Sequence, residues 1–499
     1  MLLLWLLIVP LLAGLLAFLF RKRSLMELAN LTAFAIEFCL AAALAAQVLR
    51  NGPVSLWNGF FYADALSALV ILLSAFVALA CSIYAVGYFR DDEESGVFQE
   101  IQESSGRAAI DKLREYYALA PIFICSMILV ALANNLGILW IAVEGTTLAS
   151  VFLVMFYGRE TSLEAAWKYA IIASVGLSLA LFGTILTYYS AFRLLGTETL
   201  ASLNWSVLAG NAANFDKPTM RLAFILILLG FGTKAGIAPM HTWKPDAYSE
   251  APIPAAALLA TGVLNCAVYA LMRFYVLSSK CLGPQFASHL LVIFGLLSIG
   301  VAVPFILVQK NFRRLLAYSS IDHSGIMVLA LGFGGPLGIL GMLLHMTFHS
   351  ITKPLLFFCA GNVQQHLNTD LFRKARGGLI HSMPLTGAAF LLATLAVTGS
   401  PPFSLFQSEF TILRSAFSAG YFVVAIIFIG FLVTIFSGFL VHISSLVLGA
   451  DPDHSPPKSC RWKSASIVGL AAIVIVIGFW LPSPLYRLIQ GAAGIVMGG

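Results

Sequence analysis

Hydrophobic positions in this chain fall into about fourteen continuous runs separated by short polar connections. A membrane core about 30 Å thick is crossed by roughly 20 apolar residues in a helix, which is the length of each run. A closed β-barrel would instead show short segments of alternating apolar and polar residues. The pattern therefore predicts an all-α polytopic membrane protein. The runs begin near Leu2, Met26, Tyr62, Tyr116, Leu136, Leu163, Met220, Ile253, Ala287, Leu316, Pro336, Met383, Tyr421 and Ser464.

Composition agrees with this pattern, because 60% of the 499 residues are hydrophobic and only 10% are charged. The first run, Met1 to Phe20, has no basic segment before it and no small-residue cleavage site after it. Its charges, Arg21 to Arg23, follow it instead. A removable signal peptide has the opposite arrangement, so we expect this run to be the first membrane helix.

Basic residues are unevenly divided between the connections. With fourteen helices, the odd-numbered connections hold about eighteen Lys and Arg, whereas the even-numbered ones and the C-terminal tail hold about eight. Lysine and arginine favour the cytoplasmic side, so the odd connections are predicted to be cytoplasmic and both termini to lie outside. The net charge of +6 is then a topology signal. It is not expected to bind nucleic acid, because no basic cluster is interleaved with aromatic residues on a soluble surface.

The sequence lacks the common motifs for bound cofactors. The seven cysteines form no C-x-x-C pair, and the chain has neither a G-x-G-x-x-G nor a P-loop sequence. Iron–sulfur, zinc and nucleotide sites are therefore not predicted, and no cofactor is expected in this chain.

Two predicted helices are interrupted by Gly and Pro beside a charged residue, in FGTKAGIAP at 231–239 and in TGSPPFSLFQSEF at 398–410. They lie in predicted helices 7 and 12. Broken helices at matching positions of two halves indicate a transport site. A third break is expected at Lys353-Pro354. In the longest connection, Arg90 to Glu115, the run AIDKLREYY suggests a short cytoplasmic surface helix, with a solvated linker as the alternative.

Only three basic residues fall inside predicted helices: Lys168, Lys234 and Lys353. A charge near the membrane centre costs several kcal/mol, so each one indicates a partner or a hydrated cavity. Lys234 lies deep in helix 7 beside a break that admits water, and can act as a switchable proton carrier near Glu144. Glu144 lies roughly 14 Å into helix 5, at 1.5 Å per residue. Lys168 is near a helix end and can instead reach the cytoplasmic interface.

The run LLHMTFHSITKPLLFF places His345, His349 and Lys353 at successive i, i+4 positions, which form one polar stripe on an apolar helix. Histidine both accepts and donates protons near neutral pH, so the stripe predicts a proton relay. Metal binding by the two histidines is the competing interpretation. It lacks a carboxylate ligand on the same stripe.

Other ionisable residues extend this picture. His323, preceded by Asp322, can continue the stripe toward one surface, and Glu409 beside the second break can load or release protons. Glu37, alone in helix 2, is equally compatible with a structural or a functional role. The segment PMHTWKPDAYSEAPIP combines His241, Asp246 and Glu250 with several prolines, which is typical either of a proton uptake region or of a rigid turn.

At these residues the chain resembles the antiporter-like membrane subunits of respiratory complex I, multisubunit cation/proton antiporters and membrane-bound hydrogenases. The matching segments are WIAVEGTTL, GTKAGIAPMHTWKPDAYSEAP, LAYSSIDHSG, HMTFHSITKPLLFF and GSPPFSLFQSEF. EAAWKYAIIASVGLSLALFGTILTYY and GVLNCAVYALMRF are most similar to the F subunit of hydrogenase-4 in formate hydrogenlyase-type complexes. The resemblance implies two inverted five-helix repeats. The expected division is 1–115 for helices 1–3 and a cytoplasmic loop, 116–280 and 281–450 for the repeats, and 451–499 for a connector and helix 14.

The resemblance also implies roles in proton transfer. Glu144 and Lys234 would be a coupled pair with Lys168 as an accessory lysine, and Glu409 would be the terminal site. A central axis would be formed by His345, His349 and Lys353. Complex I relatives often carry a further lysine in helix 8, where this chain has Asn265, so the route is expected to cross that point through water and histidine.

The expected function is proton translocation within a redox-driven complex, of the membrane-bound [NiFe]-hydrogenase/formate hydrogenlyase type or like complex I, in the plasma membrane of a prokaryote. Nothing in the chain carries electrons, so the energy must come from other membrane subunits and a peripheral cytoplasmic redox module holding Fe–S clusters and Ni–Fe or flavin. The first alternative is a Na⁺/H⁺ antiporter module, with Glu144, Thr146 and Thr147 as weak Na⁺ ligands. A scaffold that has lost transport is the second, and the ionisable stripe disfavours it.

Overall fold

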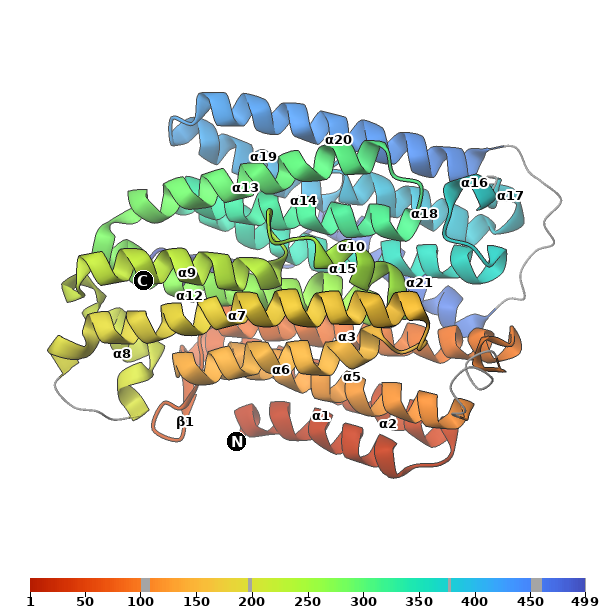
Figure 1. Cartoon of the computed structure of the whole chain (residues 1–499), viewed down its shortest axis with the longest axis horizontal. Helices are drawn as coiled ribbons and strands as arrows, with labels where there is room; N and C mark the ends of the chain where they lie inside the picture. Colours follow the sequence, from red (N-terminus) through yellow and green to blue (C-terminus); the bar gives the residue numbers. More distant parts are fainter. Residues whose placement is uncertain (100–107, 196–199, 376–377, 450–459, 499) are drawn as a thin grey trace.

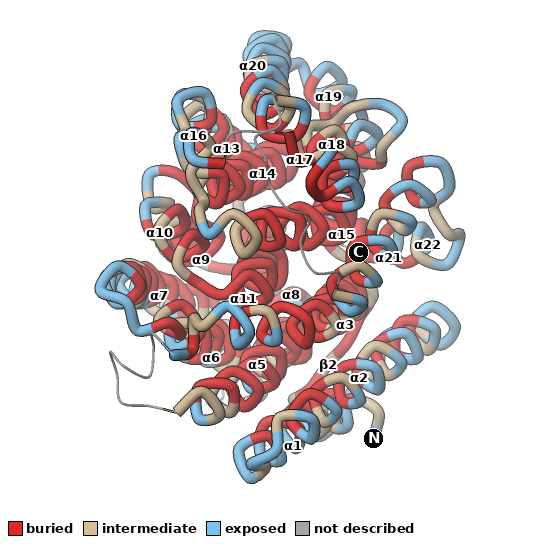
Figure 2. Tube along the Cα trace, turned by 90° about the vertical axis from the view of Figure 1, so that its right-hand side faces the viewer, coloured by how far each residue is buried: buried red, intermediate tan, exposed pale blue. Residues whose placement is uncertain are grey.

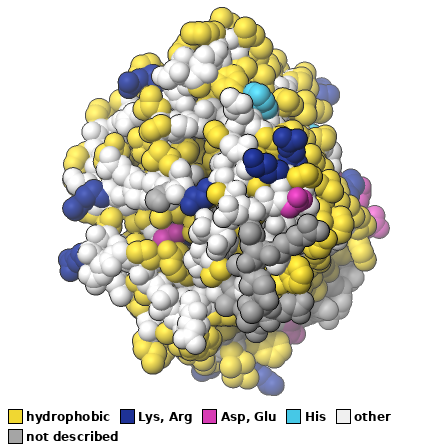
Figure 3. Space-filling model, turned by 90° about the vertical axis from the view of Figure 1, so that its left-hand side faces the viewer, with side chains coloured by type: hydrophobic (Ala, Val, Ile, Leu, Met, Phe, Trp, Pro, Cys, Tyr) yellow, Lys and Arg dark blue, Asp and Glu magenta, His cyan; other side chains and the backbone are white. Residues whose placement is uncertain are grey.

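The computed structural model describes residues 1–99, 108–195, 200–375, 378–449 and 460–498 of the chain. Long helices run side by side along one axis, and both ends of the chain lie toward the end that carries β1 and α8 (Figure 1). Figure 3 views that end, where charged side chains are scattered among hydrophobic and uncharged ones.

The elements, in chain order, are α1 (Leu2–Leu19), α2 (Arg23–Asn51), β1 (Val54–Leu56), β2 (Phe61–Ala63), α3 (Ala65–Glu94), α5 (Ala109–Leu132), α6 (Leu136–Val154), α7 (Glu160–Leu195), η1 (Leu200–Leu203), α8 (Trp205–Asn211), η2 (Ala212–Asn214), α9 (Lys217–Ala235), α10 (Trp243–Glu250), α11 (Ile253–Leu258), η3 (Leu259–Val263), α12 (Leu264–Leu282), α13 (Pro284–Leu307), α14 (Phe312–Phe333), α15 (Gly335–Leu367), α16 (Phe372–Ala375), α17 (Leu379–Ser382), α18 (Pro384–Val397), α19 (Ser404–Ser418), α20 (Phe422–Leu448), α21 (Arg461–Phe479) and α22 (Ser483–Val496). The two strands form an antiparallel hairpin.

Twelve helices among the described residues are long and apolar enough to cross a membrane. The two other predicted runs, near Pro336 and Met383, form the long helix α15 and the pair α18–α19. The all-α polytopic prediction is therefore confirmed. The polar stripe lowers the mean hydropathy of α15, and a break divides the run near Met383 into the shorter helices α18 and α19. Neither run is therefore identified as a membrane helix by length and composition alone.

Burial divides the helices into an inner and an outer group (Figure 2). The most apolar stretches of the α11–α12 segment and of α14 are completely buried, whereas that of α20 is only 28% buried. Because lipid tails are as apolar as leucine, outer helices keep apolar residues on their exposed face. Polar groups can therefore accumulate only inside, where other helices provide hydrogen-bond partners.

Several local predictions were wrong. Residues 109–117 form the first turns of α5 rather than a separate surface helix, so the predicted boundary between residues 115 and 116 falls inside a helix. α15 continues through Pro354 without ending. A helix irregularity that was not predicted, the π-helical turn η3, lies just before Asn265. The division into inverted repeats stays a prediction.

The two predicted breaks are confirmed, and they are built alike. α9 is followed by Gly236 and α18 by Gly399, each with a φ of +68°, a value that glycine adopts without strain. Each glycine is followed by a cis X–Pro bond, at Ala238-Pro239 and at Pro401-Pro402. The chain then resumes as α10 and α19. Both breaks thus bring a second helical segment back to the end of the first.

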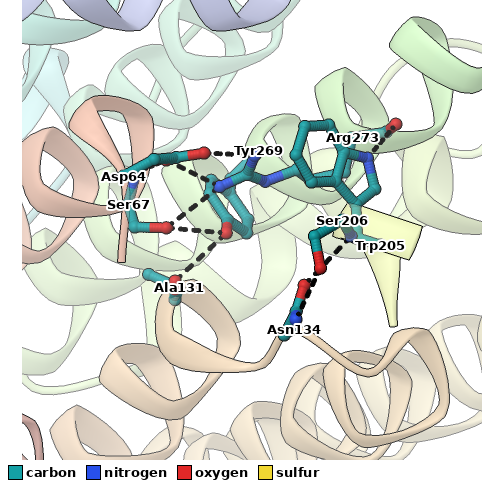
Figure 4. Close-up of polar contacts among 8 residues, drawn as sticks. All are labelled: Asp64, Ser67, Ala131, Asn134, Trp205, Ser206, Tyr269 and Arg273. Carbon is teal, nitrogen blue, oxygen red and sulfur yellow. Dashed lines mark hydrogen bonds and ion pairs between the residues drawn. The ribbon is translucent and has the colours of Figure 1, made fainter. Parts of the chain in front are cut away.

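A buried ion pair fastens α3 to α12 (Figure 4). Arg273 donates to both carboxylate oxygens of Asp64, over 2.7 and 2.8 Å, and also to Ser67 Oγ at 3.0 Å. Its guanidinium lies 4.2 Å from the centre of the Trp205 ring. The count of basic residues by connection had placed Arg273 outside the membrane helices, and that was wrong, because α12 continues to Leu282.

Candidate functional site

Most of the ionisable residues singled out in the sequence lie inside the bundle, in α9, α14, α15 and α19. Their side chains are at most 6% exposed. They form a buried row that consists of Lys234, His323, His345, His349, Lys353 and Glu409. The tertiary structure brings them together from segments far apart in the sequence, since α15 packs against both α14 and α19.

Lys234 lies in the last turn of α9, where it faces α6 and α7. Its Nζ donates to Tyr169 OH at 2.7 Å and to Thr147 Oγ1 at 2.9 Å. The tyrosine oxygen lies 2.7 Å from Ser150 Oγ, and Ser150 donates its own hydrogen to Thr146 O. A hydroxyl has one hydrogen, so Tyr169 donates to Ser150 and accepts from Lys234. The amine is therefore held by two hydroxyl groups.

Glu144 lies on α6 close to this cluster and is only half-buried. Ser174 Oγ donates to its Oε1 at 3.2 Å, while its enclosed Oε2 has no hydrogen-bond partner among the described residues. No direct ion pair joins Glu144 to Lys234 in the described part of the chain, although the two charges interact through space. The hydroxyl of Thr147 is bonded to Lys234 and that of Thr146 to Val143 O. The side-chain oxygens of Glu144, Thr146 and Thr147, considered as Na⁺ ligands, thus each bond to a different protein group.

A directed chain of hydrogen bonds leads from α14 to α19. His323 Nδ1 lies 2.9 Å from His345 Nε2, and His345 Nδ1 lies 3.0 Å from Ser408 Oγ. Ser408 donates its hydrogen to Leu405 O at 2.7 Å, so it accepts from His345. A neutral imidazole has one donor and one acceptor, and His345 must then accept from His323. The chain ends at Ser408, the residue before Glu409 in the sequence.

His349 and Lys353 continue the stripe along α15. The rings of His323 and His349 are 4.8 Å apart, and both nitrogens of His349 lack a hydrogen-bond partner among the described residues. Lys353 Nζ donates to Ser319 Oγ at 2.8 Å and to Leu316 O at 3.1 Å, and it interacts through space with Asp322. Buried polar atoms normally bond to protein or to ordered water, so water is expected beside His349.

Glu409 lies against the second helix break. A Cβ at Gly399 would overlap its carboxylate, so the glycine leaves the space that this side chain occupies. The residue is 6% exposed, and no cation pairs with it among the residues that the structure describes. The acid is thus enclosed at one end of the buried row.

Other sequence-predicted residues lie nearer the surface. Lys168 is 47% exposed and pairs with Glu164 at 2.6 Å and with Asp246 at 3.1 Å. Asp246 also binds Arg314 at 2.6 Å. This cluster joins α7, α10 and α14 outside the buried row. His241, in the connection before α10, is half-buried, and its enclosed Nδ1 has no partner among the described residues.

Two further residues from the sequence analysis are Glu37, which lies apart from the row, and Asn265, which has no titratable group. Glu37 is completely buried on α2, with both carboxylate oxygens unpartnered in the described ranges. Asn265 lies beside the row on α12, where its Nδ2 donates to Ser350 Oγ at 2.8 Å. Within the described residues, no group of three or more His, Cys, Asp or Glu is placed to hold a metal ion.

Lys244 is a completely buried lysine in the bundle that sequence reasoning missed. It was assigned to a cytoplasmic connection, but α10 folds back against α14 and Lys244 is completely buried. The available signal was its position directly after the Gly-Pro break, in HTWKP, where the chain re-enters the bundle. Counting charges by connection could not detect this, because α10 is too short to be a membrane helix.

Comparisons with known proteins cover most of the chain. Residues 133–437 match the family described as NADH:quinone oxidoreductase/Mrp antiporter, TM. The hydrogenase-4 component F homolog of Methylacidiphilum infernorum is 36% identical over 400 residues, which are 80% of this chain and 81% of that one. NADH-quinone oxidoreductase subunit N of Desulforudis audaxviator is 30% identical over 477 residues, 89% of each chain.

The fold is also similar to solved structures. A chain of the membrane-bound sulfane sulfur reductase, an archaeal respiratory membrane complex, superimposes with a TM-score of 0.86 over 99% of this chain and 97% of that one. The two sequences are 23% identical, so this likeness concerns the fold.

Proposed function

Because this chain belongs to the NADH:quinone oxidoreductase/Mrp antiporter transmembrane family, we propose that it moves protons through its buried row of lysines and histidines when a redox partner in the same complex reacts. The family resemblance predicted from the motifs is confirmed, and the chain is an antiporter-like membrane subunit. The roles of individual residues and the identity of the partner are the proposed part.

One observation carries the proposal: the oriented contact from His323 through His345 to Ser408, beside Glu409. A proton arriving at His323 can displace the Nδ1 hydrogen onto His345 Nε2, and His345 then passes its own Nδ1 hydrogen to Ser408. Ser408 in turn gives up its own hydroxyl hydrogen, which is directed at Leu405 O before the transfer. Each step moves one proton across an existing hydrogen bond and leaves the net charge unchanged. Glu409, the residue after Ser408 in the sequence, is the proposed acceptor of the proton at the end.

Lys234 would act at the other end of the row. Charged lysine donates three hydrogens and accepts none, and here Tyr169 and Thr147 accept two of them. Glu144 interacts through space with the amine but does not neutralise it by direct contact. A change in the Glu144–Lys234 separation would therefore alter the stability of the charged amine, because their attraction falls with distance.

The energy would come from partner subunits. Moving one charge against 100 mV costs about 2.3 kcal/mol, which hydrogen bonds within this chain cannot supply repeatedly. We infer a peripheral cytoplasmic redox module, with Fe–S clusters and Ni–Fe or flavin, attached through other membrane subunits. A hydrogenase of the formate hydrogenlyase type is the first candidate, since a relative named as a hydrogenase-4 component shares 36% of the aligned residues.

The test is reconstitution of the intact complex in proteoliposomes with a pH-sensitive dye in the lumen. Proton movement should appear only when the electron donor and acceptor are supplied, and should collapse in Lys234→Ala and in Glu144→Gln. Normal pumping in both variants would refute the site assignment. Sodium-dependent proton exchange by the isolated chain, without electron transfer, would support the Na⁺/H⁺ antiporter alternative and refute the redox-driven proposal.

A further inference from the structure

Lys244 is a completely buried lysine with no counter-ion among the described residues. Its side chain is 0% exposed, and its Nζ donates to Ser324 Oγ at 2.8 Å and lies 3.4 Å from Ser320 O. Among the residues that the structure describes, no carboxylate pairs with it, and the charge that acts on it is that of Lys353. Enclosing an unpaired charged amine costs several kcal/mol. A purely structural lysine at this position would carry that free-energy cost permanently. A lysine that gains and loses a proton carries it only while the amine is charged.

The first helix break holds Lys244 beside the end of α9. A Cβ at Gly236 would overlap Cδ and Cε of Lys244 and lie 2.9 Å from its Nζ. Ser324 accepts from Lys244, and its single hydroxyl hydrogen has two carbonyl acceptors within reach, Ser320 O at 2.6 Å and Ala235 O at 3.0 Å. Ala235 directly follows Lys234. The amine therefore lies over the break, next to the turn that carries Lys234.

On its other side, Lys244 faces the histidine row. Its hydrogen-bond partners Ser320 and Ser324 lie on α14 on either side of His323. The charge of Lys244 acts on both His323 and His349. The titratable groups around it are His323 on α14, His349 and Lys353 on α15, and His241 on the connection before α10.

A gap separates the two hydrogen-bonded clusters. The Lys234 cluster ends at Tyr169, Thr147 and Ser150, and no hydrogen bond joins it to His323 in the described ranges. On α12 the nearby Asn265 has an amide that cannot carry a proton at neutral pH. We propose that Lys244 is a further proton carrier, which connects Lys234 to the His323–His345 chain through the break in the first broken helix.

This inference rests on the proposed function and adds one step to it. Neutral Lys244 accepts a proton from the Lys234 side and becomes an ammonium group. It then returns one proton to the imidazole of His323 or His349 and is neutral again. No bond other than N–H is made or broken, and the proton count is conserved. Repulsion from Lys353 helps the charged amine to release its proton.

The experiment compares variants of the intact complex in proteoliposomes. Lys244→Met keeps the apolar stem over Gly236 but removes the titratable group, and should lower proton translocation by about a hundredfold or more, the usual contribution of a positioned acid–base group. The matched control is Lys112→Met, because Lys112 is also buried but pairs with Glu115 at 3.2 Å at the end of α5. It should pump at the wild-type level. Wild-type pumping by Lys244→Met would refute the inference.

A second variant separates a carrier from a structural cation. Lys244→His keeps a titratable group, and its ordinary pKa of about 6.5 is far below the value of about 10.4 for a lysine amine. This variant should pump at mildly acidic pH and lose pumping at alkaline pH, where the imidazole no longer takes up a proton. A ratio to wild type that does not change with pH would refute the carrier role, even if Lys244→Met fails to assemble.

Parallel measurements on Lys234→Ala distinguish failure of this inference from failure of the proposed function. If Lys234→Ala abolishes pumping while Lys244→Met does not, the proton route exists but bypasses Lys244. If neither substitution alters pumping, the row as a whole is not the proton route. Assembly of each complex is checked by the amount of partner subunit that co-purifies.

Discussion

His323 and His345 form a direct imidazole–imidazole hydrogen bond, with Nδ1 of the first 2.9 Å from Nε2 of the second. They come from different helices, α14 and α15, and both side chains are almost fully buried. Ser408 donates its own hydrogen to Leu405 O and so accepts from His345 Nδ1, which leaves Nε2 of His345 to accept from His323. A relay with a single direction therefore results.

Substituting His345 by Gln should interrupt this relay. Glutamine can still donate and accept one hydrogen bond each, but its amide does not exchange protons at neutral pH. We expect proton translocation to fall about tenfold or more with normal assembly of the complex. His442→Gln is the control, because His442 on α20 is only partly buried and, among the described residues, hydrogen-bonds to Leu307 O away from the buried row. Equal pumping by the two variants would contradict the relay.

Tyr169→Phe tests the support of Lys234. The ring that stacks on Trp243 at 4.5 Å is retained, but the oxygen that accepts from Lys234 is lost. A hydrogen bond to a charged group contributes about 1.5–3 kcal/mol, so we expect pumping to fall about tenfold or more while the complex stays assembled. Tyr189→Phe provides a match on the outer face of α7, where the side chain is 61% exposed. If both variants pump alike, Tyr169 has only a packing role.

Gly399→Ala should displace Glu409. The added methyl group would overlap the carboxylate, and the φ of +68° disfavours any residue with a Cβ. We expect loss of proton translocation that is larger than the loss of assembled complex. Gly430→Ala, on the exposed helix α20 with no atom within 4 Å of the new Cβ, should be silent in both measurements. Normal pumping by Gly399→Ala would show that the position of Glu409 is not critical.

Asp64→Ala should destabilise the fold without a specific effect on proton transfer. It leaves the guanidinium of Arg273 buried and unpaired, which typically costs about 3–5 kcal/mol. The expected result is a lower thermal unfolding temperature of the detergent-solubilised complex. Glu164→Ala removes a partner in an exposed pair with Lys168 and should change stability by less than about 1 kcal/mol. Similar unfolding temperatures for both variants would contradict the role assigned to the buried pair.

The sequence alone determined the class of this protein and most of its chemistry. Apolar runs long enough to span lipid permit only helices, and ionisable residues within them have few structural explanations. The stripe of His345, His349 and Lys353 follows from helical periodicity, which is local. The breaks after Lys234 and before Glu409 follow from glycine and proline, which also act locally.

Only the tertiary structure decided which of these groups meet. Lys168 lies in a predicted helix, yet its helix faces outward and the amine reaches a surface cluster. Lys244 lies in a predicted connection, yet the break turns α10 inward and buries the amine against α14. A hydrophobicity pattern registers the length of a segment and the polarity of its residues. It does not register which way a re-entrant segment folds, because that depends on contacts with helices distant in the sequence. In this protein those contacts placed Lys244 between Lys234 and His323.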